Sequence, residues 1–128
     1  MKYTVIKRKN PQKKEEVKFH PYPIKSGIIK SKDIADEIAG RCSLTSGDIM
    51  NVFKNLQEIL PKYLAMGYNV KLDNIGTFRV TFKTEGTTDL EKVDENKIKK
   101  IVVHIITDKE LRESTEQKMT FEKQLKKP

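Results

Sequence analysis

The side chains in this sequence that could do chemistry are mainly lysines and arginines. Residues 1–30 carry nine of them against two glutamates, a net charge of +7, whereas residues 31–128 carry 17 against 16 acidic residues. Such an uneven distribution favours a polyanionic partner, with nucleic acid first among the candidates, although a solubilising basic tail is the alternative. The densest basic cluster comprises Lys7, Arg8, Lys9, Lys13 and Lys14.

Two further groups of cations lie near predicted strands. Arg79 and Lys83 alternate with apolar residues, so they share one strand face. Lys97, Lys99 and Lys100 lead into a later strand, where alternation places the first two on one face and Lys100 on the other. Contacts of this kind set the affinity for phosphate but read no base sequence. Because no base-reading cluster of Asn, Gln and Arg is present, we expect nucleic-acid binding that depends steeply on salt and is weakly sequence-selective.

Other kinds of chemistry find little support. The two histidines, His20 and His104, stand in separate segments, and the single cysteine, Cys42, has no metal-ligand spacing to either. We interpret Cys42 as a small half-buried apolar residue. No nucleophile–base arrangement, Gly-rich phosphate loop or RNA-binding aromatic motif is present, so we expect no enzyme activity, no metal or other cofactor, and no small-molecule substrate.

The apolar runs are only about three residues long, which is too short to span a membrane. The N-terminus, "MKYTVIKRKN", lacks the apolar stretch of a secretory signal. We therefore expect a cytoplasmic protein.

The N-terminal segment has the composition of a short β-hairpin. Residues 3–8 and 17–19 have high β propensity, and Asn10-Pro11 between them is a turn signal. The "HPYPIKSG" that follows, with two prolines and a glycine, predicts a linker.

Two helices are predicted next. "SKDIADEIAGR" indicates a short amphipathic helix with Ser31 as its N-cap and a glycine at its end. A longer helix starts after Thr45, which pairs with Asp48 in a weaker version of the capping box. Apolar residues then recur at helical spacing as far as residue 64, and the stripe is wide enough to pack against another copy of itself. Pro61 should bend or restart this helix, and Gly67 supplies a left-handed C-terminal residue.

The remainder predicts strands and a final helix. Residues 68–72 and 77–82 alternate like strands around a tight corner at Asp73-Asn74-Ile75-Gly76. Residues 101–106 are apolar on both faces apart from His104, a pattern typical of a strand covered on both sides, and we interpret His104 as packed or hydrogen-bonded rather than as a ligand. Thr107-Asp108 could cap a helix over "KELRESTEQK", and "MTFEKQLKKP" is expected to be a tail with one anchor, Phe121.

In this order, "SKDIADEIAGRCSLTSGDIMNVF" and "LDNIGTFRV" resemble the HU/IHF family of bacterial architectural DNA-binding proteins. The resemblance covers roughly residues 30–113. The preceding "YTVIKRKNPQKKEEVKFHPYP" is similar to the extension of the HU-like variants found in gut Bacteroidetes. We accordingly expect a basic N-terminal β extension with linker at 1–25, and an HU-like DNA-binding domain with a C-terminal tail at 26–128.

The resemblance implies an α+β fold that forms an intertwined homodimer. Its helical base would be shared between subunits, below a three-stranded sheet whose β-ribbon arms wrap the minor groove of double-stranded DNA. Phe78 would point into the dimer core, Arg79 and Lys83 to the DNA-facing saddle, and Lys109 and Arg112 would flank the DNA. The implied function is that of a nucleoid-associated protein. A protein-interaction or structural module on the same dimer, with little DNA affinity, is the alternative.

The sequence departs from the family at the arm tip. The family has an Arg-Asn-Pro element there whose proline wedges between base steps. Residues 84–96 contain neither proline nor arginine, and they carry five acidic residues against one lysine. One hypothesis is that the DNA-binding charge has moved to the N-terminal hairpin, so that deleting residues 1–25 would weaken binding more than neutralising Lys97, Lys99 and Lys100. The other is that the hairpin is an edge strand covering residues 101–106. Both can hold together.

Overall fold

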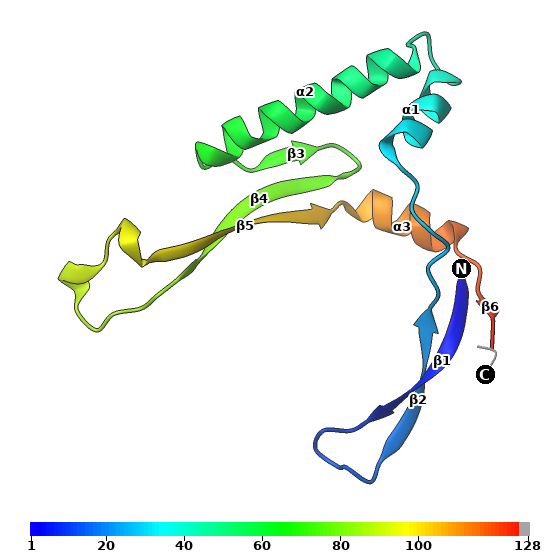
Figure 1. The fold of residues 1–128 in the computed structure, drawn as a ribbon, viewed down its shortest axis with the longest axis horizontal. Helices are drawn as coiled ribbons and strands as arrows, with labels where there is room; N and C mark the ends of the chain where they lie inside the picture. The colour runs from blue at the N-terminus through cyan, green and yellow to red at the C-terminus, as the bar shows by residue number, and fades with distance from the viewer. Residues whose placement is uncertain (126–128) are drawn as a thin grey trace. The chain divides into compact units, whose positions relative to one another are not determined.

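A computed structural model describes residues 1–125 of the chain. It has the expected α+β composition, with three α-helices and two separate three-stranded sheets (Figure 1). The chain forms two compact units, one made of residues 1–30 with the segment from Thr115 onward, the other of residues 31–114. Each unit is described by itself below.

The first unit is a hairpin extended by one more strand. β1 (Lys2–Lys9) pairs antiparallel with β2 (Val17–Pro23), as the predicted hairpin requires. β2 is longer than predicted, because His20 to Pro23 continue the strand instead of forming a linker. The hydrogen-bond pattern explains why β2 can contain two prolines. Ile24 N–H donates to Lys2 O at 2.9 Å, so the amides at even positions of β2 point toward β1. The nitrogens of Pro21 and Pro23, at odd positions, therefore point away from β1 and have no hydrogen bond to lose.

The C-terminal segment also differs from the expectation. Residues predicted as a tail contain β6 (Glu122–Lys123), which runs parallel to β1 and gives the sheet order β2-β1-β6. The amide of Glu122 donates to Met1 O at 3.1 Å, and that of Gln124 donates to Tyr3 O at 2.7 Å. These two bonds hold residues 122–124 against the start of β1.

The second unit begins with the two predicted helices, α1 (Ser31–Ala39) and α2 (Ser46–Ala65), which pack against each other. The capping box is confirmed: Asp48 N–H donates to Thr45 Oγ1 at 3.1 Å, and Thr45 N–H donates to Asp48 Oδ2 at 3.0 Å. α2 is a single element with Pro61 inside it, so the predicted restart does not occur. Pro61 lies in the last turns of α2, where the loss of one hydrogen bond leaves the helix intact. Gly67 has the expected positive φ, 91°.

The sheet of this unit has the order β3-β4-β5, with β3 (Val70–Leu72), β4 (Gly76–Thr84) and β5 (Ile98–Thr107). β4 and β5 form a long ribbon that extends past β3, and a loop with two short 3₁₀ turns, η1 (Leu90–Lys92) and η2 (Glu95–Lys97), closes its far end (Figure 1). The last helix, α3 (Lys109–Lys118), follows β5 as predicted.

The tight corner before β4 is held from a distant part of the chain. Asn74 adopts a positive φ of 66°, and its amide donates to Asp108 Oδ2 at 3.0 Å. The amide of Asp108 in turn donates to Ile75 O at 2.9 Å. Gly76 lies so close to β5 that a Cβ there would come within 2.7 Å of Ile106 O. The corner therefore fixes the point at which β4 meets the end of β5.

The apolar core of the single chain is small. Among the described residues, the buried apolar side chains are Ala35, Ile49 and Leu64. β5 is not covered on both sides as its sequence predicted, since Ile101 is 66% exposed and Val103 56%. Cys42 is likewise exposed, not half-buried. Within residues 1–125, the hairpin strands and β5 belong to different sheets, with orders β2-β1-β6 and β3-β4-β5. The apolar sequence of β5 thus indicates cover that this chain does not itself supply.

Candidate nucleic-acid interface

The register of β4 and β5 sorts their side chains onto two contrasting faces. Phe78, Val80 and Phe82 lie opposite Ile105, Val103 and Ile101 and make one face apolar. The other face carries Arg79 opposite His104, Thr81 opposite Val102, and Lys83 opposite Lys100. Lys71 of β3, opposite Thr77, belongs to the same side. We call this second surface the basic face; its polar members are Lys71, Thr77, Arg79, Thr81, Lys83, Lys100 and His104.

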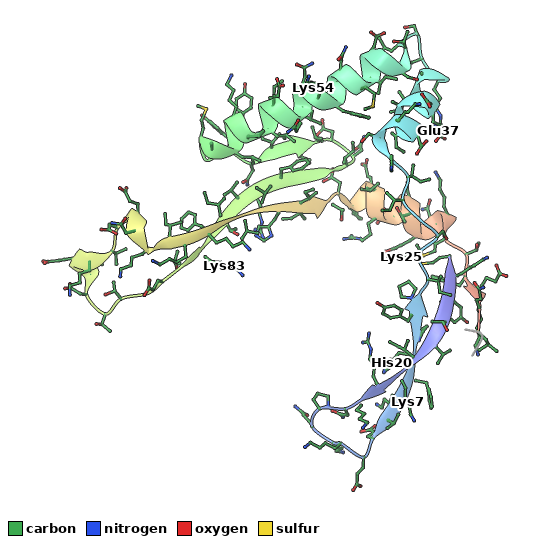
Figure 2. The ribbon with its side chains drawn as sticks, viewed as in Figure 1. Lys7, His20, Lys25, Glu37, Lys54 and Lys83 are labelled. Carbon is green, nitrogen blue, oxygen red and sulfur yellow. The ribbon has the colours of Figure 1, made fainter. Side chains whose placement is uncertain are left out.

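The basic face has no acidic residue at any of these ladder positions. Lys83 and Lys100 are directly opposed, and like charges in that arrangement repel each other across a sheet. Both side chains are exposed, as is that of Arg79. Lys83 projects from the ribbon on the side away from α2 (Figure 2). An anion placed over this face would relieve the repulsion.

His104 occupies the middle of the basic face. It is half-buried, and its Nε2 lies 2.7 Å from Thr81 Oγ1, a hydrogen bond between neighbouring strands. His104 was predicted to be a packed or capped core residue; it is hydrogen-bonded but only half-buried, and its place opposite Arg79 was not foreseen. Lys71 was also missed, because the three-residue strand that positions it was too short to assign faces from sequence.

Of Lys97, Lys99 and Lys100, only Lys100 lies on the basic face. The ladder shifts register between Lys83 and Thr84, so Lys99 has no partner in it, and Lys99 Nζ instead lies 3.1 Å from Glu85 Oε2. Lys97 belongs to η2, where its carbonyl accepts a hydrogen bond from Glu85 N–H at 2.8 Å. Simple alternation, which placed Lys97 and Lys99 together on one face, is therefore wrong here.

The acidic arm tip is partly structural. Asp89 accepts a hydrogen bond from the Glu91 amide at 3.1 Å and caps η1, while Asp94 accepts one from the Asn96 amide at 2.9 Å and caps η2. Leu90 stands between them with 87% of its surface exposed. Val93, which follows η1, is 59% exposed, so the tip presents carboxylates and two apolar side chains.

The N-terminal hairpin carries a second set of cations. Lys7, Arg8 and Lys9 lie on β1, and Arg8 is directly opposite Lys18, a second pair of opposed like charges. Arg8, Lys9, Asn10, Pro11, Lys18 and His20 line a cavity of about 230 Å³. Sequence reasoning missed Lys18, which alternation along β2 would have placed beside Arg8 once the register was known.

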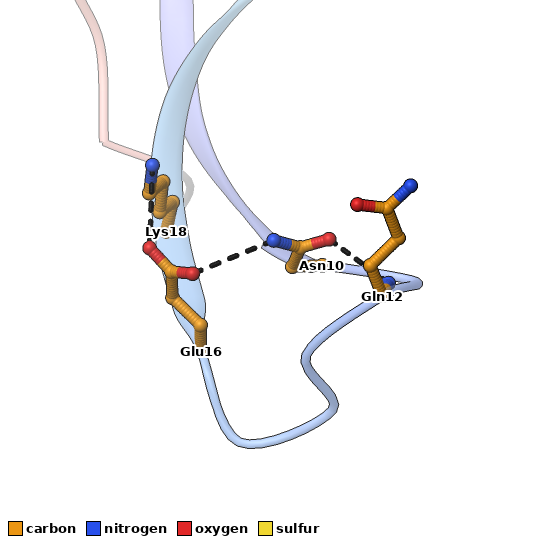
Figure 3. A network of polar contacts seen from close by, with 4 residues as sticks. All are labelled: Asn10, Gln12, Glu16 and Lys18. Carbon is orange, nitrogen blue, oxygen red and sulfur yellow. Dashed lines mark hydrogen bonds and ion pairs between the residues drawn. The ribbon is translucent and has the colours of Figure 1, made fainter.

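The turn of the hairpin is organised around Glu16. Its Oε1 lies 3.3 Å from Lys18 Nζ, its Oε2 accepts a bond from Asn10 Nδ2 at 3.4 Å, and Asn10 Oδ1 accepts one from the Gln12 amide at 3.0 Å (Figure 3). Lys13 and Lys14 lie in this turn and are exposed. Lys109 and Arg112 are exposed on α3, where Lys109 lies 3.6 Å from Glu113. The predicted cations therefore occupy three places: the ribbon, the hairpin and α3.

The apolar face of the ribbon forms one wall of an open groove against α2. The groove has a volume of about 670 Å³. Its walls include Leu60, Leu64, Phe78, Val80, Phe82 and Val103. Phe82 and Val103 remain more than half exposed there, so the groove is unfilled apolar surface.

Within residues 1–125, no group of three or more His, Cys, Asp and Glu side chains is placed to hold a metal ion. No α-helix in that same part of the chain is long and apolar enough to cross a membrane.

Comparison with protein families gives a match over nearly the whole chain. Residues 1–123 match the family called HU-HIG, which is described as an HU domain fused to a wHTH, Ig or glycine-rich motif. The chain belongs to the HU-HIG family. The resemblance to HU proteins drawn from the residues is thereby confirmed, and the match includes the N-terminal hairpin as well as the helices and ribbon.

A solved structure has the same fold. It is that of a protein from Bacteroides vulgatus ATCC 8482 for which bacterial DNA binding has been proposed; it is 16% identical in sequence and superposes with a TM-score of 0.63. The alignment covers 99% of this chain but 50% of that protein, so this HU-HIG chain spans half its length. No curated protein matches the sequence.

Proposed function

We propose that this HU-HIG protein is an architectural DNA-binding protein of the bacterial nucleoid that contacts the phosphate backbone of double-stranded DNA. The observation that carries the proposal is the basic face, where Lys83 directly opposes Lys100, Arg79 lies on the same face four residues along β4, and no ladder position carries a carboxylate to neutralise them. Repulsion between these cations destabilises the free protein, and a bound polyanion removes that repulsion. Membership of a family built on the HU domain supports DNA as that polyanion.

The functional form is a homodimer. The groove between α2 and the ribbon is open and apolar, and Ile101, Val103 and Ile105 each expose more than half of their surface. A monomer rarely leaves so much contiguous apolar surface in water. A second copy of the chain, presenting the same face, supplies cover of matching chemistry, as an isologous contact does.

The mode of binding follows from the chemistry of the cations. Lysine and arginine contacts to phosphate position DNA without reading its bases, so the complex is weakly sequence-selective and strongly salt-dependent. The acidic arm tip, with Asp89 and Asp94 committed to capping its turns, is poorly suited to close contact with phosphate. The protein therefore bends DNA less than a protein whose arm inserts a proline. Lys97, Lys99, Lys109 and Arg112 contribute at the margins of the surface.

The hairpin adds a second group of phosphate contacts. Arg8 and Lys18 are opposed there as Lys83 and Lys100 are on the ribbon. Lys7 and Lys9 lie on the other face of β1, and Lys13 and Lys14 lie in the turn of the hairpin. Each of the two basic surfaces offers its own set of phosphate contacts.

A second candidate function, a protein-interaction module with little DNA affinity, is favoured by the arm tip. Leu90 is 87% exposed among carboxylates, and residues 31–128 carry a net charge of only +1. Titration of a fluorescent duplex with the purified protein at three salt concentrations separates the two functions. DNA binding requires tight association at low salt that weakens by orders of magnitude as salt rises. Absence of binding at low salt would favour the protein-interaction module.

A further inference from the structure

One face of the N-terminal hairpin is unexplained by duplex binding. The ladder places Tyr3 opposite Pro23, Val5 opposite Pro21, and Lys7 opposite Phe19, all on the same side of the sheet. We call these six residues the aromatic face. It lies on the side of the hairpin opposite to Arg8, Lys18 and His20, which alternate with it along the strands.

The aromatic face is exposed in this chain. Phe19 exposes 68% of its surface, and Phe121, which precedes β6, exposes 69%. At the end of the hairpin near β6, the side chains surround an open cavity of about 550 Å³. Tyr3, Pro21, Pro23 and Phe121 line this cavity together with Met1 and with Tyr22, whose ladder position alternates onto the other face of β2. Flat, rigid, apolar side chains thus form a platform along the hairpin.

The residue types of the aromatic face favour one class of binding partner over two others. An added β-strand is disfavoured along β2, since the nitrogens of Pro21 and Pro23 on its outer edge carry no hydrogen to donate. A purely apolar partner would leave Lys7, which stands opposite Phe19, without a counter-charge. Aromatic side chains interleaved with cations are the surface to which single-stranded nucleic acids bind, because bases stack on the rings and phosphates lie against the cations.

The geometry points to a stacking site for unpaired nucleobases on the aromatic face, with Phe19 as one platform and Tyr3 with Phe121 as a second. Phe19 and the Pro23–Tyr3 pair are four ladder positions apart, about 13 Å at the usual rise of a strand. This separation lets different bases of one strand occupy the two platforms. Lys7 and Lys9, which lie on the same face of β1, hold the phosphates between the two platforms.

The aromatic face and the basic face of the ribbon lie on different elements, and they are proposed to bind different ligands, single strands and duplex DNA respectively. Duplex DNA keeps its bases stacked inside the helix and offers only phosphates and groove edges, whereas a single strand exposes the ring faces. Every base has such a ring face, so the site accepts single-stranded DNA and RNA alike.

The test uses the full chain and two single-stranded oligomers of equal length. One is oligo-dT, and the other is an abasic oligomer with the same phosphates but no bases, so that the difference in affinity isolates stacking. Fluorescence anisotropy should show tighter binding of oligo-dT than of the abasic strand. Phe19→Ala should reduce oligo-dT affinity by roughly fivefold to a hundredfold, the usual effect of losing one stacking side chain, and should leave abasic binding unchanged.

Controls separate this site from the basic face. Leu90→Ala removes an even more exposed apolar side chain, from the arm tip, and should change neither affinity. Duplex binding should be retained by Phe19→Ala, which shows that the variant is folded and that the ribbon is intact. An rU oligomer should lose affinity with Phe19→Ala as oligo-dT does. The inference is overturned if the wild-type protein binds both DNA oligomers equally, or if Phe19→Ala weakens them by the same factor.

Discussion

Lys83 of β4 and Lys100 of β5 occupy directly opposite positions of the same ladder, on a face whose ladder positions include no carboxylate. Opposed like charges in a sheet typically reduce stability by about 0.2–1 kcal/mol. The repulsion between Lys83 and Lys100 therefore opposes folding of the free protein, and a bound polyanion would neutralise it. The double variant Lys83→Gln/Lys100→Gln should unfold at a higher denaturant concentration than the wild type. Lys32→Gln/Lys54→Gln on the helices, which removes the same charge elsewhere, should have little effect.

The close passage of β4 against β5 makes Gly76 sterically irreplaceable. A Cβ at this position would lie 2.7 Å from Ile106 O and 3.3 Å from Thr107 Cα, both backbone atoms that cannot turn aside as a side chain can. Gly76→Ala should lower the free energy of unfolding by about 1–3 kcal/mol, the usual effect of overpacking. Chemical denaturation measures the loss. Gly86→Ala in the arm, where nothing lies within 4 Å of the added methyl group, is the matched control. Equal stability of the two variants would mean that β4 and β5 do not approach each other closely at Gly76.

The N-terminus of α2 should make stability depend on pH in the acid range. Hydrogen bonds from the Thr45 backbone amide, and then from its side chain, lower the pKa of Asp48 below the usual value for an aspartate. A carboxyl whose pKa is lower in the folded state stabilises the protein above the unfolded pKa, and the contribution disappears as the pH falls through the folded pKa. The stability difference between the wild type and Asp48→Asn should therefore be present at pH 7 and vanish under acid conditions. A difference that persists unchanged at low pH would contradict this assignment.

The apolar face of the ribbon should determine the oligomeric state. Val103 lies in the groove against α2 and is 56% exposed in the single chain. Val103→Glu places a charge where the second copy would pack, so it should convert a dimer into a monomer near 14.8 kDa in sedimentation velocity. Leu90→Glu at the arm tip adds the same charge at a more exposed apolar position and should leave the dimer intact. A wild-type protein that sediments as a monomer at all concentrations would rule out the proposed homodimer.

Local patterns in the sequence were sufficient for the elements that depend on neighbours along the chain. The helical period between residues 49 and 64 predicted α2, the Thr45–Asp48 spacing predicted its capping box, and alternation predicted the shared face of Arg79 and Lys83. The resemblance to HU proteins, carried by short motifs, is borne out by the family match over residues 1–123.

Features that depend on distant contacts escaped prediction. β6 has two residues and forms only because β1 offers it an edge, and Asp108 was expected to cap α3 although its carboxylate also holds the amide of Asn74. The register shift after Lys83 removed Lys99 from the face assigned by alternation. β5 was predicted as covered because residues 101–106 are apolar on both faces, whereas the structure leaves Ile101, Val103 and Ile105 more than half exposed.

The central claim, that the basic face binds duplex DNA through phosphate, is tested most directly by the salt dependence of duplex affinity in two charge-matched variants. Affinity is measured by fluorescence titration of one short duplex at three salt concentrations for the wild type, Lys83→Gln/Lys100→Gln and Lys32→Gln/Lys54→Gln. The ribbon variant should bind more weakly, and the slope of log affinity against log salt should become shallower by about 0.9 for each phosphate that the protein no longer neutralises. The helix variant should retain the wild-type slope. Identical slopes for the two variants would show that the opposed lysines do not contact DNA and would contradict the account.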